Sequence, residues 1–159
     1  MPTHTEGDLR IMTTQVIHDP FHLVNTDPNI TAADGTANIF SDIWKYQTPI
    51  GVTHVLRAGQ TFSLYLEDAS SEVGNQTCRV QIEVRDPAEQ DTLIIYGPAL
   101  YIVSKEFRDA TLKARIGVSS DVLVPERYWI VITARDDGAI DASDSYFDML
   151  IARQRAKVI

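Results

Sequence analysis

The residues best suited to acid–base or metal chemistry are the four histidines, His4, His18, His22 and His54. His18 and His22 stand four residues apart, a spacing that brings two imidazoles to one metal ion when the segment is a helix. Pro20 lies between them and disfavours a helix, because it lacks a backbone N–H and its ring clashes with the preceding turn. His54 stands alone in a segment with strand character. The histidines therefore predict no metal site, and we expect surface or hydrogen-bonded roles for them.

A second candidate is the acidic segment 136–144, which holds four aspartates and one glycine. A calcium ion takes about six to eight oxygen ligands from a bending loop, and these carboxylates supply part of such a set. Their spacing does not fit the common calcium-binding loop. Asp and Ser are also frequent in ordinary turns, where their side chains bond the neighbouring backbone. The segment is thus a calcium site or an ordinary turn, and the sequence leaves both open.

Nucleophilic and phosphate chemistry find no support in the sequence. No serine lies in a Gly-x-Ser-x-Gly turn, and the glycines are not clustered into a phosphate cradle. The single cysteine, Cys78, alternates in register with Val80, Ile82 and Val84, so we expect a small buried apolar side chain. The sequence therefore predicts no enzyme, no cofactor and no catalytic residue.

Four aromatic side chains alternate away from the apolar positions of their segments: Tyr65, Tyr101, Trp129 and Tyr146. Such a stripe can bind a sugar or a protein surface. Aromatic residues on strands also pack simply against the sheet, which is the alternative.

Composition narrows the class of protein. The chain has 159 residues and a formal net charge of −8, and the isoelectric point is about 4.8. This acidity disfavours binding to nucleic acid or to anionic membranes, because both need clustered Lys and Arg. The start of the chain shows no secretion signal, and no apolar run approaches the roughly 18 residues of a membrane span. We expect a single globular domain with an appendage.

Period-two alternation predicts about eight strands and no helix of useful length. The expected strands are 9–17, 51–57, 61–67, 77–85, 92–105 with a bend at Gly97-Pro98, 111–118, 128–135 and 145–152. One-sided strands bury their apolar faces against a second sheet, so the predicted fold is an all-β, antiparallel two-sheet sandwich, Ig-like or jelly-roll-like. Segments 128–135 and 145–152 flank an Asp/Gly-rich connection, and we expect them to form an antiparallel pair around which the sheet is built.

Residues 18–50 hold no sustained period, yet they are too apolar for a disordered tail. We expect an extended N-terminal arm that packs on its own domain or on a neighbouring subunit. The predicted organisation is an N-terminal strand and arm over 1–48 and a sandwich over 49–159. The candidate subunit-interface residues are Phe40, Ile43, Trp44 and Tyr46.

Several stretches resemble a known class of protein. They are 46–53 (Tyr-Gln-Thr-Pro-Ile-Gly-Val-Thr), the hairpin 56–66, and the closing 128–133, 136–138 and 145–147. Over residues 46–153 the chain resembles the sandwich domains of capsid decoration and minor structural proteins of tailed bacteriophages. The resemblance implies no catalytic residues, binding to a capsid lattice, and assembly commonly as trimers with arms reaching across neighbours.

The leading hypothesis is therefore a non-enzymatic virion structural protein that forms a homo-oligomer and contacts other capsid proteins. It also predicts that removing residues 1–45 abolishes assembly and leaves a folded β domain. The alternative is an Ig-like or carbohydrate-binding module that uses the strand aromatics.

Overall fold

The computed structural model describes residues 14–68, 76–102, 112–115 and 120–158, and within these ranges every regular element is a β-strand. The strands are β1 (Thr14–Val24), β2 (Ile30–Ala32), β3 (Ser41–Gln47), β4 (Thr53–Leu56), β5 (Thr61–Asp68), β6 (Gln76–Arg85), β7 (Thr92–Ile102), β8 (Leu112–Arg115), β9 (Val122–Val124), β10 (Trp129–Arg135) and β11 (Ile140–Val158). The described ranges hold no helix long and apolar enough to span a bilayer.

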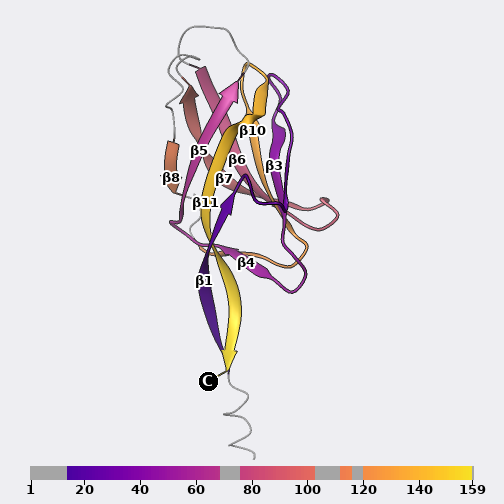
Figure 1. Ribbon diagram of the computed structural model, residues 1–159, viewed down its shortest axis with the longest axis vertical. Coiled ribbons are helices and arrows are strands. Elements are labelled where there is room, and N and C mark those ends of the chain that lie inside the picture. The colour runs from indigo at the N-terminus through magenta and orange to yellow at the C-terminus, as the bar shows by residue number, and fades with distance from the viewer. Residues whose placement is uncertain (1–13, 69–75, 103–111, 116–119, 159) are drawn as a thin grey trace, which may run out of the picture.

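The strands form two antiparallel sheets that pack face to face (Figure 1). One sheet has the order β2-β3-β10-β6-β7, and we call it the β10 sheet. The other, the β11 sheet, has the order β8-β5-β11-β4-β9, with β1 added on β11. The strands of each sheet have one apolar face. Stacking the two sheets removes the apolar face of each from water. The predicted all-β, two-sheet antiparallel sandwich is confirmed.

The core lies between the sheets and follows the alternation of the sequence. Trp44 on β3 meets Phe147 on β11 at a ring-centroid distance of 4.9 Å. The strands supply buried side chains at every second position: Phe62, Leu64, Leu66, Cys78, Val80, Ile82, Val84, Ile130, Ile132, Ala134, Phe147, Met149 and Ile151. The prediction for Cys78 is confirmed, because its thiol is buried and unbridged.

The longest strand, β11, organises its sheet. It pairs with β1 from Asp148 to Val158, so β1 occupies one edge and β5 and β4 follow one another along the other. The pairing with β4 ends at Gln154. Beyond it, within the described residues, β11 is paired with β1 alone. The end of this two-stranded pair, residues 14–19 and 153–158, runs past the lower end of the sandwich (Figure 1). We call this end the ribbon.

The expected pairing of segments 128–135 and 145–152 is wrong. Their strands, β10 and β11, belong to opposite sheets. Both edges of β10 are taken, by β3 and by β6, so no edge is left for β11. The Asp/Gly-rich connection instead crosses from one sheet to the other. Gly35 then fixes the start of β11 through two backbone hydrogen bonds with Ile140, of 2.9 and 3.1 Å.

The segment 18–50 contains more strand than its sequence pattern indicates. β1 continues through Pro20, which an outer strand tolerates because one of its sides carries no ladder bonds. In β3 the pairing with β10 shifts register, so that Ile132 faces Trp44 and Thr133 faces Asp42. This bulge breaks the period of two and lets the consecutive residues Ile43 and Trp44 both be buried.

Further differences concern the count of strands and their limits. The described ranges contain eleven strands rather than about eight, because β2, β3 and β9 escaped the periodicity analysis. Residues 9–13, 103–105, 111 and 116–118 of the predicted strands lie outside the described residues. The predicted bend at Gly97-Pro98 is confirmed, since the register of β7 shifts there against β6. The division into 1–48 and 49–159 stays a prediction, although β1, β2 and β3 contribute to the two sheets.

Candidate functional site

Three of the four predicted interface residues are buried in the chain's own core. Ile43, Trp44 and Tyr46 are 0%, 1% and 3% exposed. Phe40 is 39% exposed, and its neighbour Ile39 is 57% exposed. Between residues 39 and 46, the apolar surface left for a neighbouring molecule is therefore the Ile39-Phe40 pair. The role of the four residues in an interface stays a prediction.

Tyr46 and His54 form a closed polar contact between the sheets. The Tyr46 hydroxyl lies 2.9 Å from His54 Nε2, and the Phe21 ring packs 4.6 Å from the imidazole. Burial lowers the pKa of His54 and raises the pKa of Tyr46 to about 12. At neutral pH both groups are thus uncharged, and a hydrogen bond joins the Tyr46 hydroxyl to His54 Nε2. His54 is 1% exposed, so this pair stabilises the fold and does not meet a substrate.

His18 and His22, the other histidines that the structure describes, are not placed to share a metal ion. His18 and His22 lie on strand β1, where a spacing of four residues separates two side chains by about 13 Å. His22 Nε2 stands 3.8 Å from a carboxylate oxygen of Asp148 at the surface. His4 lies outside the described residues.

A cluster of charged side chains covers the outer face of the β10 sheet. Arg85 forms a two-pronged pair with Asp42, with both N–O distances at 2.8 Å, and it also donates to Glu83 and Glu89. Lys45 reaches Glu89 at 2.5 Å. Hydrogen bonds from Arg85 and Lys45 lower the pKa of Asp42 and of Glu89, respectively, and the bond to Asp42 raises the pKa of Arg85. We call these five residues the ion cluster.

The ion cluster buries the middle of β10 on the side away from the core. Val131 is 0% exposed, and its cross-strand neighbours on that face are Lys45 and Glu83. Lys45 also stands 4.8 Å from the centre of the Trp129 ring. The side chains of the cluster are therefore committed to covering the sheet, and its three carboxylates are paired with two cations. This arrangement stabilises the fold and offers no free acid or base.

Of the predicted aromatic positions, Trp129 lines a hollow. This hollow has a volume of about 580 Å³ and is also lined by Asn29, Gln47, Ile50 and Arg127. Its size and its mixed polar and apolar lining suit a small ligand. The two tyrosines on the opposite sheet stack on each other instead: Tyr65 and Tyr146, with ring centroids 5.9 Å apart. The side chain of Tyr101 lies outside the described part of the chain.

In the acidic segment 136–144, Asp141 uses its carboxylate within the segment's own turn. Asp141 accepts hydrogen bonds from the Ser143 N–H and hydroxyl, which lower the pKa of this carboxyl. Ser145 fills a bulge in β11: its hydroxyl accepts from the Glu67 N–H and donates to the Asp141 carbonyl. These contacts are those of the turn alternative.

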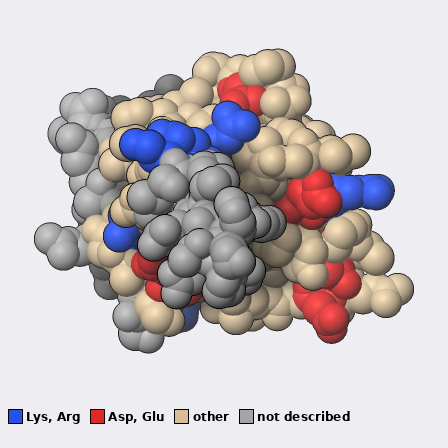
Figure 2. All heavy atoms as spheres, turned by 90° about the horizontal axis from the view of Figure 1, so that it is seen from below, with Lys and Arg blue, Asp and Glu red and all other residues tan. Residues whose placement is uncertain are grey.

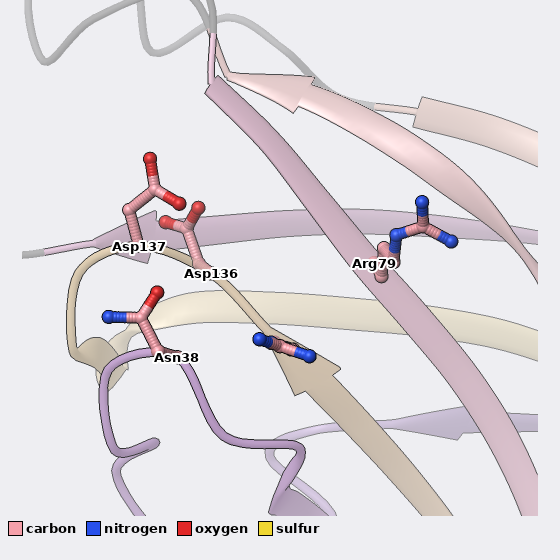
Figure 3. A pocket seen from close by; sticks show the side chains of 5 residues that line it. Asn38, Arg79, Asp136 and Asp137 are labelled. Atoms are coloured by element: carbon pink, nitrogen blue, oxygen red, sulfur yellow. The ribbon is translucent and has the colours of Figure 1, made fainter.

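The Asp136-Asp137 end of this segment lines a small polar hollow with Asn38, where the two carboxylates lie side by side and Arg79 points away (Figure 3). Across the described ranges, no group of three or more His, Cys, Asp or Glu side chains is placed to hold a metal ion.

The ribbon has two chemically different faces, because directly paired residues of two strands share a face. One face carries three cations and one anion in the pairs Gln15–Lys157, Ile17–Arg155 and Asp19–Arg153. The other is uncharged and holds Val16, which is 57% exposed. Figure 2, a view from this end of the molecule, shows a group of Lys and Arg on one flank and several Asp and Glu, one beside a further cation, on the opposite flank. The sequence analysis missed this site, although Arg153, Arg155 and Lys157 alternate with uncharged residues.

Fold and surface together define an all-β sandwich with a charged, two-stranded projection. The chain is similar in fold to VP17, a capsid protein of bacteriophage P23-77, with 7% identity over 92% of this chain and 100% of that one, at a TM-score of 0.42. It is also similar to the VP16-VP17 complex of the two major capsid proteins of that phage, with 6% identity, 89% and 100% coverage and a TM-score of 0.42.

A third solved structure is the Clostridium thermocellum xylanase 10B, as its CBM22-1-GH10 modules with xylohexaose. It matches 88% of this chain and 26% of that one, with 13% identity and a TM-score of 0.30. No protein-family model matches the sequence, and no curated protein does.

Proposed function

We propose that the chain is a non-enzymatic structural protein of a virion, a capsid decoration or minor capsid protein. It assembles with copies of itself and with other capsid proteins through the ribbon and through exposed apolar side chains. The resemblance of residues 46–153 to the sandwich domains of such proteins supports this function.

The observation that carries the proposal is the ribbon. A two-stranded pair alone in water is marginally stable, because it buries little apolar surface. The ribbon nevertheless keeps residue-by-residue pairing out to Thr14 and Val158. It also exposes Val16 and three cations on a chain of net charge −8. A partner surface would both stabilise the ribbon and neutralise these charges.

The first experiment measures the mass of the purified chain by size-exclusion chromatography with light scattering over a range of concentrations. We expect an oligomer whose mass rises with concentration. Peptides of the chain should also be found by mass spectrometry in virions purified on a density gradient. A chain that stays monomeric and is missing from virions contradicts the proposal.

The role of the N-terminal arm in assembly is better tested by point variants than by deletion of residues 1–45. That deletion removes β1, β2 and Trp44, which is 1% exposed in the core, so the remaining chain would not keep its fold. Substitution of the exposed residues Ile39 and Phe40 by serine leaves the core intact. We expect the doubly substituted chain to fold normally and to assemble less tightly.

One observation favours a carbohydrate-binding module as the second candidate. The hollow beside Trp129 combines an aromatic ring with the amide side chains of Asn29 and Gln47, which suit sugar hydroxyls. Binding on a glycan array that is lost in Trp129→Ala would favour this function. A Tyr146→Ala chain serves as the control, since Tyr146 lies on the other sheet.

A further inference from the structure

An apolar hollow opens where the edges of the two sheets meet. It is lined by Val84, Leu93, Leu123 and Tyr128, and its volume is about 350 Å³. Leu93 lies on β7 and Leu123 on β9, which are each the last strand of their sheet. These two leucines are 50% and 56% exposed. We call this hollow the mouth.

The mouth is open although part of its lining faces the core. Leu93 pairs with Val84, and two residues on Ile95 pairs with Ile82, which is fully buried. Leu93 therefore projects toward the space between the sheets, yet half of its surface stays in contact with water. Covering this surface would continue the core outward at the edge of the sandwich.

The rim of the mouth is acidic. Asp86 and Asp91, at the two ends of the β6–β7 turn, both line it. An occupant that complements the mouth thus combines apolar side chains with positive charge. Lysine or arginine near the rim would be attracted, whereas a second acidic edge would be repelled.

The ribbon has this combination. Its charged face carries the half-buried Ile17, which is paired with Arg155, and the next pair on that face holds Lys157. The ribbon points away from the body that carries the mouth (Figure 1). A partner for the mouth of one molecule is therefore the ribbon of another. Because the whole chain carries a net charge of −8, copies repel one another except where a cationic segment meets an acidic one.

We propose that the ribbon of one copy docks its charged face in the mouth of a second copy, which places Ile17 against Leu93 and Leu123 and Arg155 and Lys157 beside Asp86 and Asp91. The inference rests on the proposed function, since it names the partner in the assembly. Donor and acceptor surfaces differ, so each molecule gives one ribbon and receives another. Such head-to-tail contacts close into a ring or extend as a chain.

Charge reversal tests the contact. Lys157→Glu changes the donor and Asp91→Lys changes the acceptor, and both side chains are exposed. We expect each variant to weaken self-association about tenfold or more, and the chain with both changes to recover it. Arg79→Glu and Asp144→Lys change charge equally at exposed positions outside both surfaces, and they should assemble as the unchanged chain does.

A cysteine pair tests the direction of the contact. The native Cys78 is 0% exposed, so it does not take part in mild surface oxidation. A chain with Ile17→Cys and Leu123→Cys should give covalent oligomers larger than dimers under mild oxidation, whereas either single change should not. Circular dichroism shows that each variant is folded.

The outcomes separate this inference from the proposed function. If the unchanged chain forms oligomers while both reversals match their controls and the cysteine pair gives no ladder, the ribbon does not dock in the mouth and assembly uses another surface. If the unchanged chain stays monomeric at every concentration, the inference falls together with self-assembly, and the search for the chain in virions alone decides the structural role.

Discussion

Strand β11 passes through two regions that differ in what holds them. In the sandwich its inward positions are Phe147, Met149 and Ile151, which are at most 2% exposed. Two residues further along the same alternation comes Arg153, followed by Arg155 and Lys157 in the ribbon. The strand and its pairing with β1 continue without a break. What ends at Arg153 is therefore the apolar side of the strand.

This contrast shows that one pair of hydrogen-bonded strands can stabilise the fold along part of its length and present side chains to a partner along the rest. Full burial of an apolar side chain stabilises a fold by about 1.5–3 kcal/mol, whereas an exposed ion pair contributes about 0–1 kcal/mol. The sandwich therefore sets the free energy of unfolding. The ribbon adds little to it and keeps its side chains available for a partner.

The largest effect should come from the sandwich side of β11. Phe147→Ala removes the ring that packs on Trp44 at 4.9 Å and leaves a cavity. We expect a loss of about 3–5 kcal/mol in the free energy of unfolding, measured by urea denaturation. The matched change in the ribbon, Val16→Ala, should cost less than about 0.5 kcal/mol, because Val16 is 57% exposed. Equal losses would erase the distinction between the two regions.

The second effect concerns the ion cluster on the body. Arg85→Met removes the guanidinium that holds Asp42, Glu83 and Glu89 together. We expect a loss of about 2 kcal/mol at neutral pH, since the partly buried carboxylates of Asp42 and Glu83 lose their guanidinium while Glu89 keeps Lys45. Arg57→Met is the control: its pair with Asp121, at 3.7 Å, is exposed on both sides and should contribute almost nothing.

The same variant has a signature in acid. The pKa of Asp42 and of Glu89 is lowered from ordinary values of 3.8 and 4.5. Their stabilising contribution is therefore present above those values and is lost as the pH falls below them. We expect the unchanged chain to lose stability between pH 5 and pH 3, on the order of those values, more steeply than Arg85→Met does. Parallel curves would mean that Arg85 does not depress the pKa of Asp42, since the depression of Glu89 by Lys45 is common to both chains.

The sandwich could be predicted from sequence where each strand buries one face. Phe62, Leu64 and Leu66 alternate without interruption, and so do the positions around Ile82. The pairing of the strands could not be predicted this way, because alternation reports a buried face and not a neighbour. For this reason β10 and β11 were wrongly paired with each other.

The surface sites were harder to predict for physical reasons of their own. The bulge at Ile43 removed the period of β3, and Pro20 concealed the continuation of β1. The ribbon joins Thr14 to Val158, residues at opposite ends of the described chain, and its strand ends are polar. Such a long-range polar pairing leaves no periodic apolar signal in one sequence. The buried Tyr46–His54 contact likewise depends on β3 and β4 meeting across the two sheets.

His54 lies at the boundary between the two regions, since it pairs with Arg153 on β11. Burial lowers its pKa from the ordinary value of 6.5, so the unfolded chain binds a proton there before the folded chain does. Stability should therefore fall as the pH drops below 6.5, by at most about 1.4 kcal/mol per pH unit. Thermal unfolding between pH 8 and pH 5, a window on the order of one to two units around that value, measures it.

His54→Gln keeps a hydrogen-bonding group near the Tyr46 hydroxyl and removes the titration. Its stability should change less with pH than that of the unchanged chain over the same interval. Hydrogen exchange should locate the effect at the backbone of β4 and of Ile151 and Ala152. An equal pH dependence in both proteins would place the titrating group elsewhere.

The smallest effect is expected within the ribbon itself. Arg155 Nε donates to Asp19 Oδ2 at 2.5 Å, but the two side chains remain 52% and 41% exposed. Arg155→Ala and Asp19→Ala should each change the free energy of unfolding by less than about 0.5 kcal/mol, and a double-mutant cycle should give a coupling of similar size. High salt should remove this coupling, because the pair is accessible to screening ions. A coupling above about 1.5 kcal/mol would mean that the ribbon unfolds with the sandwich as one cooperative unit. Arg153 would then mark no boundary between two regions of β11.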